Sequence, residues 1–193
     1  MGKIFMVTGK SATGKDTIYK RLLDNVDLTT IVSYTTRPIR SGEVDGVEYY
    51  FVTVEQLKEL EEQGKIIEQR AYSTVCGVWN YFTVNDGQFD QEDCNYILIG
   101  TLVQYEKMRN YFGQDRVIPI YIEVDGAERL IRSVTRERQQ QKPKYAEVCR
   151  RFLADEVDFS EENIQRLGIT KRYKNDDLDA CVAEITRDIK VIL

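Results

Sequence analysis

Histidine is absent from the 193 residues, and proline and tryptophan are scarce, with three and one. Without histidine, any acid–base or metal chemistry must use other side chains. The four cysteines, Cys76, Cys94, Cys149 and Cys181, are far apart and form no CxxC pair. This spacing argues against both a disulfide framework and a zinc site. We therefore expect four free thiols in a reducing compartment.

Long apolar runs and a basic excess are also missing. The longest apolar run, VIPIYI, is far shorter than the roughly 20 residues that span a bilayer. The N-terminus leads directly into a strand pattern and shows no secretory signal. Acidic residues outnumber basic ones, 32 to 27, which argues against a general nucleic-acid binder. We expect a soluble, cytoplasmic monomer or homodimer whose partners are small molecules, with no nucleic acid and no membrane among them.

Short apolar runs alternate with amphipathic segments along much of the chain. Strands are predicted at 3–9, 96–100, 117–124 and 169–174, and helices at about 15–26, 102–112, 126–138, 145–157 and 175–193. Pro119 places its strand at an edge or a bulge. This alternation predicts an α/β fold with a parallel sheet flanked by helices, and the glycine-rich loop at 9–17 makes it the P-loop NTPase type.

The segment 33–93 has a different composition. Its β-branched and aromatic residues, interrupted by Pro38, Gly42 and Gly46, predict short strands and turns. Thr53 and Gln56 form a capping-box pattern that starts a helix. We therefore expect one domain, with a core of 1–32 and 94–193, an inserted small β-rich lobe at 33–93, and a lid at about 136–146.

The segment GKSATGKDT, residues 9–17, has the spacing of a phosphate-binding loop. Glycines let successive backbone amides turn toward phosphate oxygens, and the following helix directs its positive end to the same place. The lysine adds a point charge for the β- and γ-phosphates. The predicted ATP-binding residues here are Gly9, Ser11, Ala12, Thr13, Gly14, Lys15, Asp16 and Thr17.

A second motif, SYTTRPIRSGEVDGVEYYF at 33–51, resembles the signature of the guanylate kinase family. The matching residues are Ser33, Thr36, Arg37, Arg40, Gly42, Glu43, Asp45, Gly46, Tyr49 and Phe51, and only Glu48 departs, replacing an aspartate. In that family this lobe binds GMP. The resemblance implies GMP contacts from Ser33, Arg37, Arg40 and Tyr49, and two arginines with a tyrosine hydroxyl suit a monophosphate.

The resemblance extends to the base-reading segment. Glu68 stands where the family has a glutamate that accepts from the N1 and N2 donors of guanine. The run STVCGVWNYFTV is longer than its family counterpart and does not align with certainty, so Tyr81 and Thr83 are candidates for phosphate and base contacts. This irregularity keeps open a kinase for another nucleoside monophosphate.

Two positions depart from the family pattern. Asp16 stands where a hydroxyl is usual, and Thr101, in our GMP-binding set, stands where a carboxylate is usual. We expect the two changes to compensate around one Mg²⁺, whose protein ligands are Asp16 and Thr17, because hard cations accept either kind of oxygen.

Arginines after residue 130 resemble the family's lid and helix arginines, which meet the transferring phosphoryl group. The predicted catalytic residues are Lys15, Arg136, Arg138, Arg150 and Arg151, although Glu137 and Glu147 also allow a solvated basic helix. Asn175, in NDDL, resembles a segment near the adenine of ATP.

Together these features predict a nucleoside monophosphate kinase of guanylate kinase type. It would transfer the γ-phosphoryl group of MgATP to GMP by positioning and neutralising two polyanions. The other class to consider is a non-catalytic guanylate-kinase-like binding module. Such modules typically lose the loop lysine, which is present here as Lys15.

Overall fold

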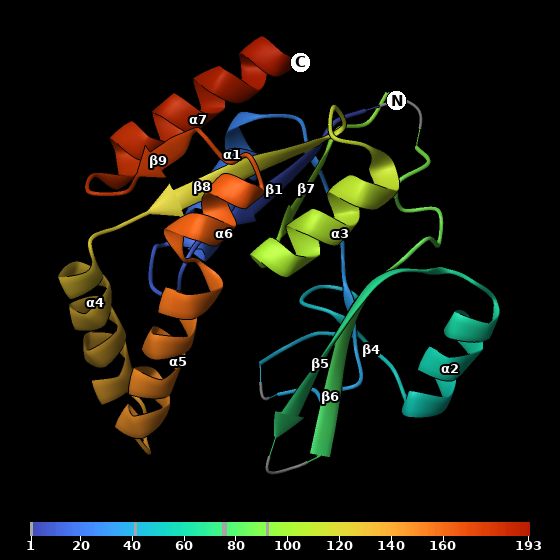
Figure 1. Cartoon of the computed structure of the whole chain (residues 1–193), viewed down its shortest axis with the longest axis horizontal. Helices are drawn as coiled ribbons and strands as arrows, with labels where there is room; N and C mark the ends of the chain where they lie inside the picture. Colours follow the sequence, from blue (N-terminus) through green and yellow to red (C-terminus); the bar gives the residue numbers. More distant parts are fainter. Residues whose placement is uncertain (1, 41, 75–76, 92) are drawn as a thin grey trace.

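A computed structural model describes residues 2–40, 42–74, 77–91 and 93–193 (Figure 1). Its core is a five-stranded sheet with the order β2-β7-β1-β8-β9, and every pairing in it is parallel. The strands are β1 (Ile4–Thr8), β2 (Thr29–Thr30), β7 (Tyr96–Ile99), β8 (Val117–Glu123) and β9 (Arg172–Lys174). This parallel sheet confirms the predicted fold class.

Helices cover both faces of the core sheet (Figure 1). They are α1 (Lys15–Asn25), α3 (Leu102–Phe112), α4 (Gly126–Arg138), α5 (Tyr145–Asp158), α6 (Glu161–Arg166) and α7 (Leu178–Ile192). Alternate residues of β1 face opposite ways, so Ile4 and Met6 pack in the cluster containing α3 and α6 residues, and Phe5 and Val7 in the cluster containing α1 and α7 residues. Burial on two faces explains why β1 is apolar throughout.

Several local predictions are confirmed. Helix α3 has the predicted bounds and ends at Gly113, whose positive φ suits glycine. Helix α4 also has the predicted bounds. Pro119 lies on β8 before the stretch, Tyr121–Glu123, that pairs with β9. Strand β8 is nevertheless internal to the sheet, between β1 and β9, and Pro119 pairs with Met6 of β1, so the predicted edge position is wrong for the strand as a whole.

The inserted segment forms a second, four-stranded sheet with the order β4-β3-β6-β5. Its elements are β3 (Tyr34–Thr35), β4 (Tyr50–Phe51), α2 (Val54–Glu62), β5 (Ile66–Thr74) and β6 (Gly77–Val84). Leu57, Phe82 and Val84 form its small core, and the capping box of Thr53 and Gln56 is present. The domain boundaries at 33 and 93 stay a prediction.

The second sheet and the α4–α5 hairpin project from the same end of the core, whereas β9 and α7 lie toward the opposite end (Figure 1). Cys94, Cys149 and Cys181 are free thiols as predicted, and Cys76 lies outside the described residues. Among the helices of the described ranges, none combines the length and the apolarity that a bilayer crossing requires.

Candidate active site

The loop between β1 and α1 has the backbone conformation that its glycines allow. Gly9 and Gly14 have φ values of 147° and 88°, and Ala12 is also left-handed at 62°. A Cβ on Gly14 would lie 2.6 Å from Nδ2 of Asn175. A side chain at position 14 would therefore be strained and would displace a buried neighbour.

Lys15 folds back over this loop. Its Nζ donates to the carbonyl oxygens of Gly9, at 2.6 Å, and Lys10, at 2.8 Å. Desolvation of the ammonium group lowers the pKa of Lys15 from 10.5 to about 8, and the nearby charge of Asp16 opposes part of this shift. The ammonium group of Lys15 therefore lies within the loop, where a bound anion would stabilise its charged form.

Asn175 supports the loop from the end of β9. Its side chain is buried, and Nδ2 donates to the carbonyl oxygen of Thr13 at 2.8 Å. Asp177 caps α7 by accepting from the amide of Ala180. The structure thus gives Asn175 a loop-supporting contact, and its predicted contact with ATP stays a prediction.

Two acidic residues of α5 hold the other side of the loop. Asp155 Oδ2 accepts from the backbone amide of Ser11 at 2.6 Å, and Glu156 Oε2 accepts from Lys10 Nζ at the same distance. Buried Arg129 donates to Glu156 at 2.7 Å. None of these three residues, Arg129, Asp155 and Glu156, was predicted from the sequence.

The predicted catalytic arginines differ in their surroundings. Arg136, at the end of α4, lies close enough to Lys15 for its positive charge to add to the lowering of the lysine pKa, which desolvation dominates. Arg138 is exposed on the same helix. Arg150 and Arg151 are exposed on α5 and pair with Glu147, at 2.7 and 3.8 Å. Arg136 is exposed as well, and its link to the loop is this effect of its charge on Lys15.

A buried polar cluster lies where the second sheet meets α3. Glu68, on β5, pairs across the strands with Thr83, whose hydroxyl donates to Glu68 Oε1 at 2.8 Å. Gln104 Nε2 donates to Thr83 Oγ1 at 3.2 Å and to Ser33 Oγ at 3.5 Å. Arg70 donates to both carboxylate oxygens of Glu68. Three predicted GMP-binding residues, Ser33, Glu68 and Thr83, therefore converge in one site.

Thr101 also belongs to this cluster. Its hydroxyl oxygen accepts from the backbone amide of Gln104 at 3.3 Å, which caps α3, and lies 3.5 Å from Nη1 of Arg70. Gly100 permits this packing, because a Cβ there would lie 2.6 Å from Oε1 of Gln104. Thr101 thus lies beside a guanidinium group.

The predicted acceptor-phosphate residues lie further along the same sheet. Arg37 is buried, and its guanidinium forms a bidentate pair with Glu43 at 2.9 Å for both bonds. Its buried Nε has no hydrogen-bond partner among the described residues. The rings of Tyr49 and Tyr81 lie 5.6 Å apart, and Arg40 is exposed nearby in sequence. One oriented donor and two hydroxyl groups suit an anion.

The predicted magnesium ligands, Asp16 and Thr17, are exposed in the first turn of α1. Within the described ranges, no group of three or more acidic, cysteine or histidine residues is arranged to hold a metal. One carboxylate and one hydroxyl still fit Mg²⁺, which usually takes one or two carboxylates plus substrate phosphates. The compensation between Asp16 and Thr101 stays a prediction, because no interaction joins the two residues.

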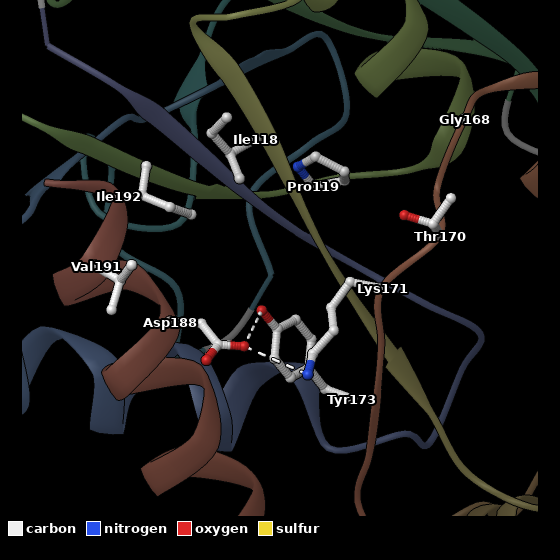
Figure 2. A pocket seen from close by; sticks show the side chains of 9 residues that line it. All are labelled: Ile118, Pro119, Gly168, Thr170, Lys171, Tyr173, Asp188, Val191 and Ile192. Carbon is white, nitrogen blue, oxygen red and sulfur yellow. Dashed lines mark hydrogen bonds and ion pairs between the residues drawn. The ribbon is translucent and has the colours of Figure 1, made fainter.

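A separate pocket lies on the far side of the core, between β8, β9 and α7 (Figure 2). In it Tyr173 and Lys171 turn toward Asp188, and Oδ2 of Asp188 lies 3.2 Å from the tyrosine hydroxyl and 3.4 Å from the lysine Nζ. None of the predicted site residues lines this pocket.

Sequence reasoning missed Arg70 and Gln104. A signal for Arg70 was available, because residues two apart on a strand face the same side and Arg70 follows Glu68 by two. Gln104 had a weaker signal, because it is the third residue of the helix predicted at 102–112.

Comparisons with known proteins match this arrangement. A family model described as guanylate kinase matches residues 1–91. The guanylate kinase of Symbiobacterium thermophilum is 32% identical over 190 residues, which is 95% of this chain and 82% of that protein. That of Porphyromonas gingivalis is 29% identical over 98% of this chain and 97% of its own length.

Other relatives match over shorter stretches. The guanylate kinase of Syntrophomonas wolfei is 39% identical over 110 residues, and this match spans only about half of that protein, 56%.

A crystal structure of guanylate kinase from Anaplasma phagocytophilum superposes with a TM-score of 0.67 at 23% identity, covering 98% of this chain and 85% of that one, and shows the fold. The nearly full-length match to the Symbiobacterium protein shows that this chain belongs to the guanylate kinase family.

Proposed function

We propose that this chain is an enzyme that transfers the γ-phosphoryl group of ATP to GMP, giving ADP and GDP. The observation that carries the proposal is the buried cluster around Glu68, in a chain that also has an intact phosphate loop. A buried carboxylate flanked by hydroxyl and amide groups can accept the N1–H of guanine. Adenine has no N–H at this position, because its N1 is itself an acceptor.

The donor triphosphate binds the loop of Gly9 to Thr17. Backbone amides and the start of α1 receive the phosphates, and Lys15 moves from the carbonyl oxygens of Gly9 and Lys10 to the β- and γ-phosphates. Asp16 and Thr17 would hold Mg²⁺, which when bound neutralises charge on the phosphate oxygens. No strong base is required, because catalysis of phosphoryl transfer depends on positioning and electrostatics.

The acceptor phosphate binds between Arg37, Arg40, Tyr49 and Tyr81. Among the candidate arginines, Arg136 is the one whose positive charge acts on Lys15. It faces the transferring group and stabilises the charge that develops there. Arg138, Arg150 and Arg151 serve a closed state in which the lid, about 136–146, covers both nucleotides. All these residues come from one chain, so a monomer suffices. We place the enzyme in the cytoplasm, where both nucleotides occur.

A coupled assay of ADP release tests the proposal, with ATP and each of GMP, dGMP, AMP, CMP and UMP as acceptor. We expect turnover with GMP and little with AMP, CMP or UMP. Turnover with a pyrimidine nucleotide in preference to GMP would contradict the acceptor assignment. GMP binding without turnover under any metal condition would indicate a binding module.

A further inference from the structure

The carboxylate of Glu68 is already nearly saturated with hydrogen bonds from the protein. Its side chain is fully buried, at 0% exposure. Oε2 accepts from Arg70 Nε at 2.9 Å, and Oε1 accepts from Arg70 Nη2 at 3.1 Å and from Thr83 at 2.8 Å. A carboxylate offers about four lone-pair sites. Three are therefore taken before any nucleotide binds.

Arg70 takes the two sites that a guanine base needs. Its Nε and Nη2 are adjacent donors that bind one oxygen each, which is the bidentate geometry of an arginine–carboxylate pair. The N1–H and N2–H groups of guanine are also adjacent donors, and they would use the same two oxygens. Both partners cannot occupy this position together.

The environment keeps Arg70 in the pocket. Its side chain is only 12% exposed, and removal of its charge would leave Glu68 buried without a cationic partner, which is strongly unfavourable. Nη1 points to a second acceptor, Thr101 Oγ1, at 3.5 Å. The guanidinium group is therefore held by Glu68 and Thr101 at the same time.

We propose that Arg70 is a specificity-determining residue that weakens recognition of the purine 2-amino group, so that this kinase accepts IMP as well as GMP. The proposal rests on the function proposed above. With Arg70 on Glu68, one carboxylate site remains for the N1–H that both purines have. The N2–H₂ group, which GMP has and IMP lacks, then finds no free site on the carboxylate and adds little binding energy. The acceptor class becomes the 6-oxopurine nucleoside monophosphates.

The test compares kcat/KM for GMP and IMP in the wild-type protein and in Arg70→Lys and Arg70→Met variants. Lysine keeps the positive charge beside Glu68 but is a point charge without the planar fork. Methionine removes both. Arg187→Met, which removes an exposed arginine of α7, is the matched control. Melting temperatures establish that each variant is folded. If Arg70→Met is unfolded, the result for Arg70→Lys alone decides the test.

We expect the wild-type ratio of kcat/KM for GMP to that for IMP to lie within about tenfold. Both Arg70 variants should raise it by about tenfold or more, the factor that one hydrogen bond to a charged group contributes. The control should leave it unchanged. A ratio in folded Arg70 variants within twofold of wild type would overturn the proposal, as would a wild-type preference for GMP beyond about 100-fold.

Failure of the proposed function gives a different result. In that case the wild-type protein releases no ADP with either nucleotide. Titration calorimetry of GMP and IMP then decides the inference, by the same ratio expressed in dissociation constants. Equal ratios in the wild-type and Arg70→Lys proteins would reject it.

Discussion

The carboxylate of Asp155, on α5, accepts a hydrogen bond from the backbone amide of Ser11 in the phosphate loop, with N and Oδ2 2.6 Å apart. Loop amides of this kind are the groups that bind phosphate oxygens. In the structure, a side-chain anion thus takes one position that a nucleotide phosphate would use. An adjacent ion pair between Lys10 of the loop and Glu156 of α5 also joins the helix to the loop.

Replacement of Asp155 should therefore strengthen ATP binding. In Asp155→Ala the amide of Ser11 is free to bind a phosphate, and we expect KM for ATP to fall roughly fivefold, within the range of one net hydrogen bond. Steady-state kinetics with saturating GMP measure the change. Asp158→Ala, on the same helix, is the control and should leave KM for ATP unchanged. A higher KM for Asp155→Ala would show that the contact assists ATP binding.

The lowered pKa of Lys15 predicts a pH dependence of ATP binding. Below pH 8 the lysine is mostly charged and attracts the phosphates, and above about pH 8 it loses its proton. ATP favours the charged form, so binding at pH 8 takes up protons and weakens by up to about tenfold per pH unit above that value. Calorimetry between pH 6.5 and 9.5 measures both effects.

A Lys15→Arg variant is the control for this pH profile, because its guanidinium group stays charged throughout the range. Its ATP affinity should be lower than that of the wild-type protein but almost independent of pH. A flat profile for the wild-type protein would contradict the assignment of Lys15 to the phosphates.

Arg136 and Arg138 provide a matched pair on one helix. The charge of Arg136 is among the main influences on the pKa of Lys15, after desolvation, Asp16, Asp155 and Arg129, whereas Arg138 is not among them. An arginine on the transferring phosphoryl group is worth about a thousandfold or more in rate. We expect Arg136→Ala to lower kcat by that order and Arg138→Ala by less than about tenfold. The reverse ranking, in single-turnover measurements of GDP formation, would place Arg138 at the reaction centre.

Asp16 should control the requirement for Mg²⁺. We expect Asp16→Ala to raise the Mg²⁺ concentration for half-maximal activity about tenfold, since the site loses its carboxylate. Asp24→Ala, exposed on the same helix, should not change it. An unchanged Mg²⁺ dependence in Asp16→Ala would assign the metal to the phosphates and Thr17 without Asp16.

Features set by neighbouring residues could be read from the sequence. The loop from Gly9 to Lys15, the capping box of Thr53 and Gln56, and the end of α3 at Gly113 all depend on local backbone preferences. Each of these features is determined by residues that are close together in the sequence. For this reason the fold class and the phosphate loop could be predicted from the sequence alone.

Features set by long-range packing were not accessible in the same way. Arg70 meets Thr101 because β5 packs against α3. Gln104, also on α3, meets Ser33, which directly precedes β3. Asp155 reaches Ser11 across 144 residues of chain. No spacing rule relates such positions. The hydrogen bonds that fill the Glu68 carboxylate, and the contact of the Asp155 carboxylate with the phosphate loop, are therefore visible only in the structure.

The most direct test of the account follows the phosphoryl group itself. ATP labelled in its γ-phosphate is incubated with GMP, Mg²⁺ and the protein, and the labelled products are separated. The account predicts labelled GDP formed in step with ADP, and loss of this product in Lys15→Ala. Labelled inorganic phosphate without labelled GDP, or equal GDP formation by Lys15→Ala, would contradict it.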